Sequence, residues 1–453
     1  MKPTVVIAGA TGFIGRWFIE KYSEKYQIIA LSRREMEDPL RDGVVWRKVD
    51  LYSVSSTIKA LEGADYALYL VHSMQPSARL NQGTFDDTDL LLADNFARAS
   101  EHVGIKQIIF VGGILPKEKS KFSRHLRSRY EVELTLGDRK PALTALRAGI
   151  IVGAGGSSFQ IVEKLVNRLP VMLCPKWTLS ETQPIALHDI LQVIDFCLGN
   201  GQAYGEAIEL GGSEQTTYME MLKQTARILG KRRHITSVPF FSLGLSKLWV
   251  ALFSDSSTKF VSPLIESLRH VMTVETHPLM AKLNLDYLSF EEAVKTTLNE
   301  RDQMPKLPRG SSTRKVKNTV RSVQRLPNGA GKNAIEVSEE YLRWLPKSFK
   351  SLIRVNKENE FVSFCIGKLP LLKLQYVKDR SDESRQVFYI TGGLLARRTD
   401  YGWLEFRSVL GGKYIIGAIH EFVPRLPWYI YIYTQAQLHL LVMKRFGEHL
   451  SKA

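Results

Sequence analysis

TVVIAGATGFIG, residues 4–15, is the stretch that decides the fold of the first part of this 453-residue chain. A short β-rich apolar run is followed by a turn with glycines at positions 9, 12 and 15, and helical spacing resumes at residue 16. Strand, glycine turn and helix together predict a dinucleotide site. Gly9 allows the tight turn, Gly12 lets the pyrophosphate approach, and Gly15 lets the helix pack on the strand. The first N–H groups of that helix favour phosphate. An ordinary strand-to-helix turn is the alternative interpretation.

Strands and helices continue to alternate after this turn. Further strands are predicted at residues 27–31, 44–48, 66–71 and 107–111, with helices at 53–61 and 86–102. This alternation indicates parallel strands with right-handed crossovers, and hence an α/β fold with an open, doubly wound Rossmann sheet. The ligand of such a sheet lies at the carboxyl ends of the strands. Later in the chain, residues 155–158 are predicted to cap a helix at 159–168 near the same cleft.

The end of the second predicted strand bears on the choice of cofactor. Ser32-Arg33-Arg34 stands where a sheet that binds NAD usually carries an acidic residue for the ribose 2′-hydroxyl. Two arginines suit a 2′-phosphate instead, so we expect NADP(H) to be preferred, with NAD(H) as the alternative. Solvated surface charge is the other interpretation of these arginines. Asp50 and Leu51 end the third strand region and are predicted to border the adenine.

Five motifs follow one another through residues 1–300. They are Gly9–Gly15, Asp50-Leu51, Leu70-Val71-His72-Ser73-Met74, Arg147–Gly153 and Pro184–Asp189. Together they resemble the atypical short-chain dehydrogenase/reductase superfamily, and more narrowly the NAD(P)-binding proteins related to NmrA-type regulators and to the 39 kDa accessory subunit of respiratory complex I. The resemblance implies an extended Rossmann fold with a small substrate lobe over the cofactor. The predicted cofactor contacts are Gly9, Thr11, Gly12, Phe13, Ile14, Gly15, Ser32, Arg33, Arg34, Asp50, Leu51, Val71, His72, Gly112, Arg129, Gly149 and Ile150.

The catalytic residues of that superfamily are missing from this chain. Active members use a tyrosine, a lysine four residues later on the same helix face, and a serine after the fifth strand. Here His125 stands at the tyrosine position, Arg129 at the lysine position, and Gly112-Gly113 where the serine would be. Arginine stays charged and cannot tune a proton donor as lysine does, but it can hold a ribose or a phosphate. Arg129 is therefore predicted at the nicotinamide ribose.

Two histidines are the candidates for proton transfer near the expected nicotinamide. His72 follows the fourth predicted strand, and His125 lies in the helix just described. The pKa of histidine suits proton transfer near neutral pH, although a histidine beside a nucleotide is more often a hydrogen-bonding wall. Two function classes stay open. One is a reductase or isomerase that acts on a hydrophobic carbonyl or quinone-like compound, and the other is a non-catalytic redox sensor or assembly factor that holds NADP(H) structurally.

The composition changes after residue 300. Residues 301–333 are basic and rich in proline, glycine and serine, which predicts an exposed linker. Residues 334–453 predict an α+β domain, with antiparallel strands at 363–366, 371–377, 386–390, 402–407 and 414–419 and a terminal helix at 428–450. Strands around a long C-terminal helix suggest a helix-grip-like domain with a hydrophobic cavity.

Short motifs in this last domain point to a ligand class. Residues 403–407, 422–429 and 433–439 resemble the uncharacterised domain often fused behind atypical dehydrogenases of this group. That domain is similar to the START/Bet v 1-like superfamily, and the resemblance implies an apolar small-molecule ligand.

The net charge of +16 fits nucleic acid, anionic lipid or phosphate-bearing ligands. No obvious nucleic-acid motif accompanies the charge, so nucleic acid is the weakest of the three. Cys174, Cys197 and Cys365 stand far apart in apolar surroundings, which predicts reduced core residues and no metal site. The first predicted strand begins at residue 4, so no signal peptide is expected. Together with the reduced cysteines, this favours a cytoplasmic protein.

Two apolar stretches raise the question of a membrane. Residues 239–253 are too short to span a bilayer comfortably, and residues 428–443 are aromatic and nearly uncharged. For residues 239–253, core packing is the first interpretation, and a hydrophobic substrate wall or a lipid-touching helix is the alternative. For residues 428–443, the two interpretations are packing in a cavity and a position at a membrane interface, which would be peripheral contact with the inner face of the membrane. The oligomeric state is left open by the sequence.

Overall fold

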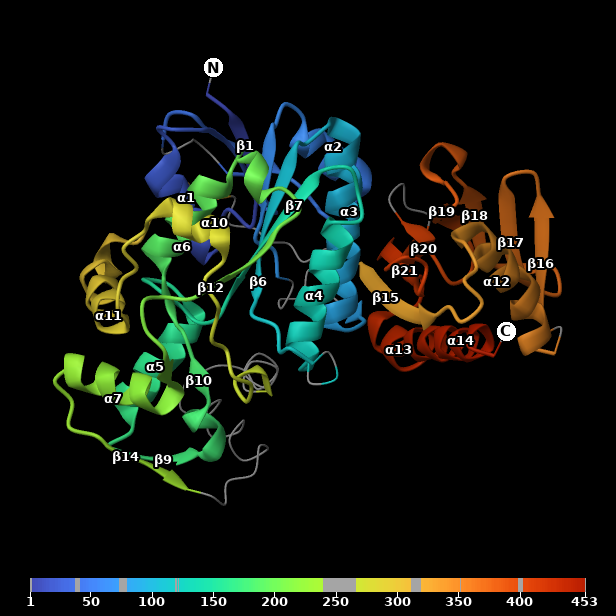
Figure 1. The fold of residues 1–453 in the computed structure, drawn as a ribbon. Coiled ribbons are helices and arrows are strands. Elements are labelled where there is room, and N and C mark those ends of the chain that lie inside the picture. Colours follow the sequence, from blue (N-terminus) through green and yellow to red (C-terminus); the bar gives the residue numbers. More distant parts are fainter. Residues whose placement is uncertain are drawn as a thin grey trace. The chain divides into compact units, whose positions relative to one another are not determined.

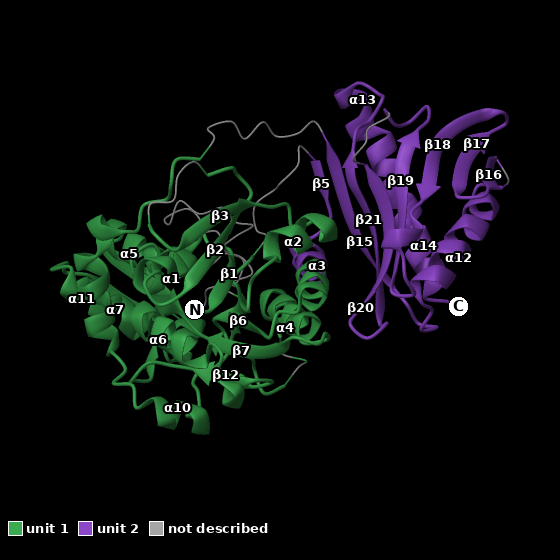
Figure 2. Cartoon of the chain, turned by 90° about the horizontal axis from the view of Figure 1, so that it is seen from above, with its two compact units in different colours: residues 1–72, 95–312 green, residues 73–94, 313–453 purple. Residues whose placement is uncertain are grey.

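A computed structural model of the protein describes residues 2–36, 41–72, 80–118, 120, 122–238, 266–310, 319–350, 352–397 and 402–452. The chain divides into two compact units, which we describe separately (Figure 2). Unit 1 comprises residues 1–72 and 95–312, and unit 2 comprises residues 73–94 and 313–453. This division differs from the predicted boundaries at residues 300 and 333.

The difference has a structural reason. Strand β15 (Val320–Pro327) occupies part of the predicted linker and pairs with β21 (Tyr414–Phe422) and with β5 (Leu80–Gln82). Its basic and polar residues made the segment resemble a solvated connector. The strand is nevertheless buried through most of its length, because its partners come from distant parts of the sequence.

Unit 1 is built on a seven-stranded sheet in the order β12-β7-β6-β4-β1-β2-β3, with all neighbours parallel. The strands are β1 Thr4–Ala8, β2 Gln27–Ser32, β3 Val44–Lys48, β4 Tyr66–Tyr69, β6 Gln107–Gly113, β7 Ala142–Ala148 and β12 Ala207–Leu210. The predicted parallel Rossmann sheet is confirmed. The strand order reverses between β1 and β4, and a doubly wound sheet binds its ligand at the carboxyl ends of the strands at such a point.

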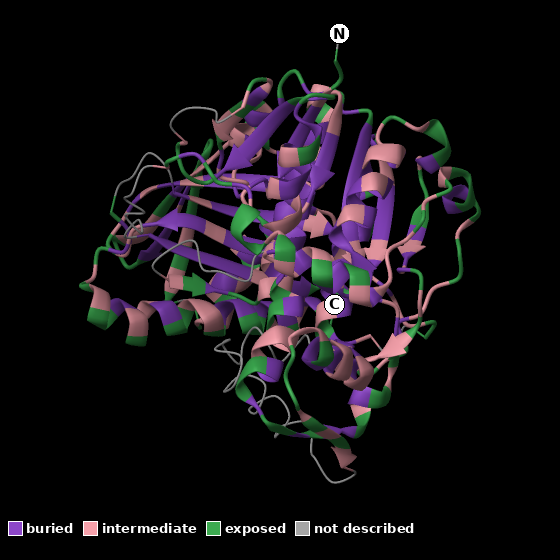
Figure 3. Ribbon diagram, turned by 90° about the vertical axis from the view of Figure 1, so that its left-hand side faces the viewer, coloured by how far each residue is buried: buried purple, intermediate pink, exposed green. Residues whose placement is uncertain are grey.

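Helices cover both faces of this sheet (Figure 1). On one face lie α1 Phe13–Tyr22 and α6 Leu187–Cys197, which pack into one buried core with the strands. On the other face lie α2 Val54–Leu61, α4 Arg124–Leu136 and residues 95–103 of α3 Phe85–Val103. The strands between these layers are buried along most of their length, except for the edge strands β3 and β12 (Figure 3).

The residues after β7 form a small lobe. Among the described residues, three short strand pairs, β8–β11, β9–β14 and β10–β13, combine there with helices. The strands are β8 Ile151–Val152, β9 Val171–Pro175, β10 Glu181–Thr182, β11 Ile185–Ala186, β13 Thr216–Thr217 and β14 His234–Val238. The helices are α5 Ser157–Arg168, α7 Tyr218–Ile228 and α11 Phe290–Asn299, whereas α10 Pro278–Leu283 packs with α6 in the core of the main sheet. The side chains of Phe159, Tyr218 and Phe290 share a buried cluster in this lobe.

Unit 2 is built on a mostly antiparallel sheet in the order β16-β17-β18-β19-β20-β21-β15-β5, in which only β15 and β5 are parallel. Its remaining strands are β16 Ile353–Glu358, β17 Phe361–Ile366, β18 Leu369–Tyr376, β19 Arg385–Gly392 and β20 Trp403–Val409. Helices α12 Ala334–Ser348, α13 Trp428–Tyr433 and α14 Gln435–Leu450 pack with the sheet in one apolar core. The five predicted strands are confirmed, whereas α12 and β16 were not predicted.

The sheet of unit 2 also carries a buried ionic cluster, on the side chains that alternate with the apolar ones. The Glu405 carboxylate accepts from Arg385 at 2.7 Å, from Arg407 at 3.0 Å and faces His420 Nε2 at 3.0 Å. Arg407 also donates to Asp94 at 2.6 Å. Burial alone would raise the pKa of Glu405, but Arg385 and Arg407 hold it well below its usual value. The carboxylate is therefore charged and fully paired in the core.

Two predictions about apolar and sulfur-bearing segments have different outcomes. Cys174, Cys197 and Cys365 are buried thiols, as predicted. The apolar stretch 239–253 lies outside the described residues. Within the described part of the chain, no helix is both long enough and apolar enough to cross a bilayer.

We predict that Arg407→Met destabilises unit 2 by about 3–5 kcal/mol, because it leaves Glu405 and Asp94 buried with one cation fewer. Urea unfolding followed by tryptophan fluorescence measures the change. Arg343→Met is the matched control: Arg343 is exposed and pairs with Glu339 and Glu340, so its loss should cost no more than about 0.5 kcal/mol. Equal effects of the two substitutions would contradict the prediction.

Candidate functional site

The glycine turn after β1 has the geometry that a phosphate site needs. Gly9 has a φ of +96°, and a Cβ atom there would lie 3.0 Å from the Leu70 backbone. A Cβ atom on Gly15 would lie 2.5 Å from the Gly9 carbonyl oxygen and 2.8 Å from the Ala10 Cα. Glycine is therefore required at both positions. Gly12 donates its N–H to the Gly9 carbonyl at 2.8 Å and is the N-cap of α1, where it has no side chain to cover the next N–H groups.

A second glycine-rich loop lies against the start of α1. A Cβ atom on Gly153 or on Gly156 would come within 3.0 Å of the Phe13 ring, and Trp17 Nε1 donates to the Ala154 carbonyl at 2.9 Å. Gly156 is also the N-cap of α5. The predicted position of the α5 N-terminus beside the glycine turn therefore agrees with the structure. The Phe13 side chain packs between the glycine turn and the loop that precedes α5, and the sequence did not suggest this role.

The residues predicted around the adenosine follow β2 and β3. Ser32 is buried and its Oγ accepts from the Arg34 N–H at 3.1 Å, whereas Arg33 and Arg34 are exposed. Asp50 accepts from the Tyr52 N–H at 3.2 Å. Arg33 and Arg34 thus stand at the end of β2, where a 2′-phosphate is predicted. The structure leaves their contact with a cofactor as a prediction.

One residue that holds this edge of the site was missed. The Asn95 Nδ2 group donates to the Leu51 carbonyl at 2.8 Å and to the Tyr52 carbonyl at 3.0 Å. Asn95 is completely buried in α3 and fixes the turn after β3. It stands more than forty residues away in the sequence, so no local pattern could identify it.

The two candidate histidines come together. His72 follows β4, and His125 lies in the first turn of α4, yet their ring centroids are 5.2 Å apart. Arg129, one helical turn after His125, donates to the Val71 carbonyl at 3.1 Å and to the Val111 carbonyl at 2.7 Å. Its guanidinium also lies over the Phe110 ring, 4.5 Å from the centroid. Arg129 therefore ties α4 to the ends of β4 and β6, and its predicted contact with the nicotinamide ribose stays a prediction.

The remaining predicted contacts lie around the same strand ends. Gly112 is part of β6, where a Cβ atom would lie 2.9 Å from the Phe110 ring. Gly149 and Ile150 follow β7, and the Ile150 side chain is buried in the lobe core, so only its backbone is available to a ligand. Thr11 and Ile14 flank Gly12 in the turn. Ser73 and Met74 lie outside the described residues.

Residues 9–149 match the family model described as NAD(P)H-binding. This part of the chain is an NAD(P)H-binding domain. The domain is 29% identical over 114 residues to the auxiliary protein GraX of Staphylococcus aureus, a match that covers 25% of this chain and 37% of GraX. A longer match, 23% identical over 244 residues, is to the mitochondrial NADH dehydrogenase [ubiquinone] 1 alpha subcomplex subunit 9 of Arabidopsis thaliana, with 52% of this chain and 60% of that protein covered.

These matches show that residues 9–149 are similar to NAD(P)H-binding proteins and that about half of the chain is similar to a subunit of NADH dehydrogenase. The chain spans less than two thirds of the length of either curated relative. Solved structures show the same fold. A nucleoside-diphosphate-sugar epimerase from Staphylococcus aureus superposes with a TM-score of 0.52 at 16% identity, over 65% of this chain and 99% of that one. An NADPH-dependent quinone oxidoreductase from Escherichia coli, complexed with NADPH, superposes with a TM-score of 0.51 at 17% identity, over 65% and 100%.

Unit 2 contains a cavity of about 160 Å³ between its sheet and the helices α12, α13 and α14. Most of its wall is aliphatic and aromatic. The lining residues with a polar side-chain group are Gln82, Ser322, Tyr341, Tyr431, Gln435 and His439. The sequence predicted a cavity but none of these residues, because Gln82 is more than 230 residues from the strand beside which it lies.

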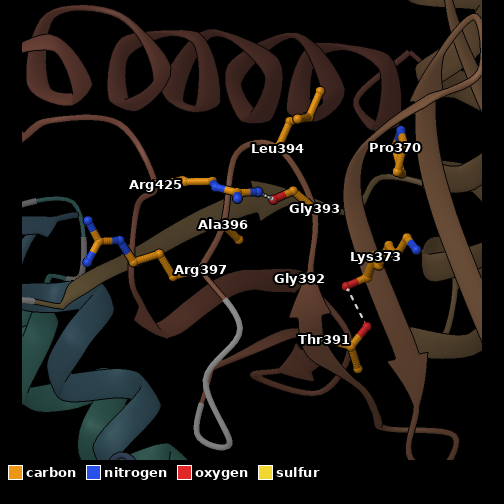
Figure 4. Close-up of a pocket in the computed structure, with 9 residues that line it drawn as sticks. All are labelled: Pro370, Lys373, Thr391, Gly392, Gly393, Leu394, Ala396, Arg397 and Arg425. Carbon is orange, nitrogen blue, oxygen red and sulfur yellow. Dashed lines mark hydrogen bonds between the residues drawn. The ribbon is translucent and has the colours of Figure 1, made fainter.

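A separate groove of about 570 Å³ lies at the end of the same sheet (Figure 4). Three cations line it, Lys373, Arg397 and Arg425. Arg425 Nη1 donates to the Gly393 carbonyl at 3.5 Å, and the Arg397 and Lys373 side chains point away from each other. The three charges do not converge on a single point, so the groove does not form a binding site for one anion.

We predict that Gly12→Ala weakens NADPH binding by about tenfold or more, because the methyl group stands before the first N–H groups of α1, where a phosphate must approach closely. Fluorescence titration of bound NADPH measures the dissociation constant. Gly201→Ala is the control, since a Cβ atom there meets nothing within 4 Å and Gly201 lies in a distant 3₁₀ turn. Unchanged affinity in the Gly12 variant would place the nucleotide elsewhere.

Proposed function

We propose that this protein is an NADP(H)-dependent reductase of a hydrophobic carbonyl or quinone-like compound, in which His125 stands where related enzymes use tyrosine and His72 lies beside it. The observation that supports the proposal most directly is the 5.2 Å separation of the His72 and His125 rings at the carboxyl end of the sheet. Both rings lie beside the strand-order reversal, where a doubly wound sheet binds its ligand.

The residues of unit 1 fit the cofactor. Gly9 and Gly15 make the tight turn and the close packing of α1 possible, Gly12 has no side chain before the first N–H groups of α1, and Arg33 and Arg34 are exposed at the end of β2. The bound cofactor would supply a hydride to the carbonyl carbon of the substrate. His72 or His125 would donate a proton to the carbonyl oxygen, which becomes a hydroxyl, and solvent would restore the histidine proton. Arg129 would act as a positioning residue, because it ties α4, which carries His125, to the end of β4.

A non-catalytic redox sensor or assembly factor is the second candidate. It is favoured by the absence of the tyrosine, lysine and serine of the superfamily from positions 125, 129 and 112. One curated relative is called an auxiliary protein and another is a subunit of a larger enzyme. In such a protein, NADP(H) would stabilise the fold or report the redox state, and the histidines would serve as a hydrogen-bonding wall.

For unit 2 we propose a helix-grip-like domain that binds an apolar small molecule. The proposal is supported by the antiparallel strand order, by the packing of α12 and α14 in one core with the sheet, and by the apolar cavity between them. The isolated cations of the groove beside it are compatible with the predicted peripheral contact with an anionic membrane surface, which is a further proposal.

The experiment that separates the two candidates uses the full-length protein freed of nucleotide. After saturation with NADPH, quinones and aldehydes are added and the absorbance of NADPH is followed. Quinones are the first class to test, because a structure of the same fold is an NADPH-dependent quinone oxidoreductase. Tight binding with no oxidation by either class would favour the sensor, and failure to bind NADPH or NADH would exclude both candidates.

With a substrate in hand, we predict that His72→Gln or His125→Gln lowers kcat by about 100-fold while the dissociation constant of NADPH changes little, since general acid catalysis contributes factors of this size. His102→Gln is the control, because His102 is exposed at the end of α3. Full turnover in both single variants and in the double variant would remove the histidines as acids.

We predict that the double substitution Arg33→Ala and Arg34→Ala lowers the affinity for NADPH by at least about tenfold and leaves that for NADH nearly unchanged, because only NADPH carries the 2′-phosphate. Parallel titrations with both nucleotides measure the preference. Loss of affinity for both would indicate a general effect on the domain, and no change would assign the arginines to solvated surface.

A further inference from the structure

The cavity of unit 2 has a neutral wall. Among the described residues that line it there is no Asp, Glu, Lys or Arg. Burial lowers the pKa of His439 to about 4, so this side chain is uncharged at neutral pH. Burial also raises the pKa of Tyr341 and of Tyr431, which keeps both phenols protonated. A charged ligand would lose its hydration here and gain no counter-charge.

One hydrogen-bonding group in this wall lacks a donor. Gln82 is only 8% exposed, and its amide Nε2 donates to the Ala436 carbonyl at 3.0 Å. That bond decides which way the amide points, because a carbonyl accepts only from the nitrogen end. The oxygen end, Gln82 Oε1, is buried and has no hydrogen-bond partner among the described residues. A buried acceptor in this state is destabilising until a donor reaches it.

A second glutamine repeats the arrangement on the helix side. Gln435 Nε2 donates to the Leu395 carbonyl at 3.3 Å, and Gln435 Oε1 is buried without a partner among the described residues. Two of the other polar groups are already engaged with each other, because Ser322 Oγ and His439 Nε2 lie 3.1 Å apart. The phenols of Tyr341 and Tyr431 also line the cavity and can donate as well as accept. Among the described lining residues, the two glutamine oxygens are therefore the buried acceptors that lack a donor.

We propose that this cavity selects a small neutral molecule with one ring-sized apolar body and a hydroxyl group, such as a phenol or a cyclic alcohol, whose O–H donates to Gln82 or Gln435. The cavity has room for one ring, because it measures about 160 Å³ and an apolar cavity of about 150 Å³ holds benzene. The ligand needs a hydroxyl group because Gln82 Oε1 and Gln435 Oε1 are acceptors that lack a donor. This inference rests on the proposal that unit 2 binds an apolar ligand, and it is independent of any reaction in unit 1.

The test compares phenol, toluene and benzoate by calorimetric titration of the full-length protein. Phenol and toluene share a ring and differ by a hydroxyl against a methyl group, and benzoate carries a charge. We expect phenol to bind at least about tenfold more tightly than toluene, and benzoate not to bind, because only phenol gives the buried oxygens a donor. Toluene binding alone would support the apolar cavity and overturn the inference, whereas no binding by any of the three would overturn the ligand-binding proposal itself.

Two variants locate the preference. Gln82→Met and Gln435→Met keep a similar side-chain length and remove the amide, so at least one should reduce the preference for phenol to about threefold or less while toluene still binds. Retained toluene binding shows that the variant is folded. Gln386→Met is the matched control, since Gln386 is also buried and donates to the Asp382 carbonyl at 2.8 Å but does not line the cavity. An unchanged preference in both cavity variants, or tighter binding of benzoate, would overturn the inference.

Discussion

The contact of Gly15 with the turn below it is the constraint on which the nucleotide site of unit 1 depends. A Cβ atom at Gly15 would lie 2.5 Å from the Gly9 carbonyl oxygen, so no other residue lets α1 come this close to the end of β1. The close approach is what brings the first N–H groups of α1 to the carboxyl end of the sheet. The loop 153–156 then packs on Phe13, and the lobe that would cover a cofactor is built from there.

The histidine pair shows how the same sheet end could carry chemistry with changed residues. In relatives with a tyrosine and a lysine, the helix after the fifth strand supplies both groups. Here that helix supplies His125, and the chain after β4 supplies His72. Arg129 occupies the lysine position but points its donors at two backbone carbonyls. Arg129 stabilises the strand ends and cannot tune a proton donor as a lysine would, so the fold of unit 1 does not by itself establish its function.

Unit 2 separates charge from apolar surface by the alternation of side chains along its strands. In β20, Glu405 and Arg407 belong to the buried ionic cluster, whereas Leu404 and Phe406 belong to the apolar core, and Leu404 lines the cavity. Successive side chains of a strand point to opposite faces, so one strand serves both environments. The charges are neutralised by one another on one face, and the cavity on the other face stays neutral.

The sequence alone determined the Rossmann sheet, its first five predicted strands, the glycine turn and the antiparallel strands of unit 2. Each of these depends on residues that are neighbours in the chain, through local motifs and through apolar side chains that recur with a period of two or of 3.6 residues. The sequence also identified His72 and His125 as candidate proton donors, because His72 follows a predicted strand and His125 lies in a predicted helix. What only the tertiary structure decided are the pairings between distant segments: β15 with β5, Asn95 with the turn after β3, Arg129 with two strand ends, and Gln82 with α14. Such contacts join residues that are tens to hundreds of positions apart, and no local periodicity records which of them will meet.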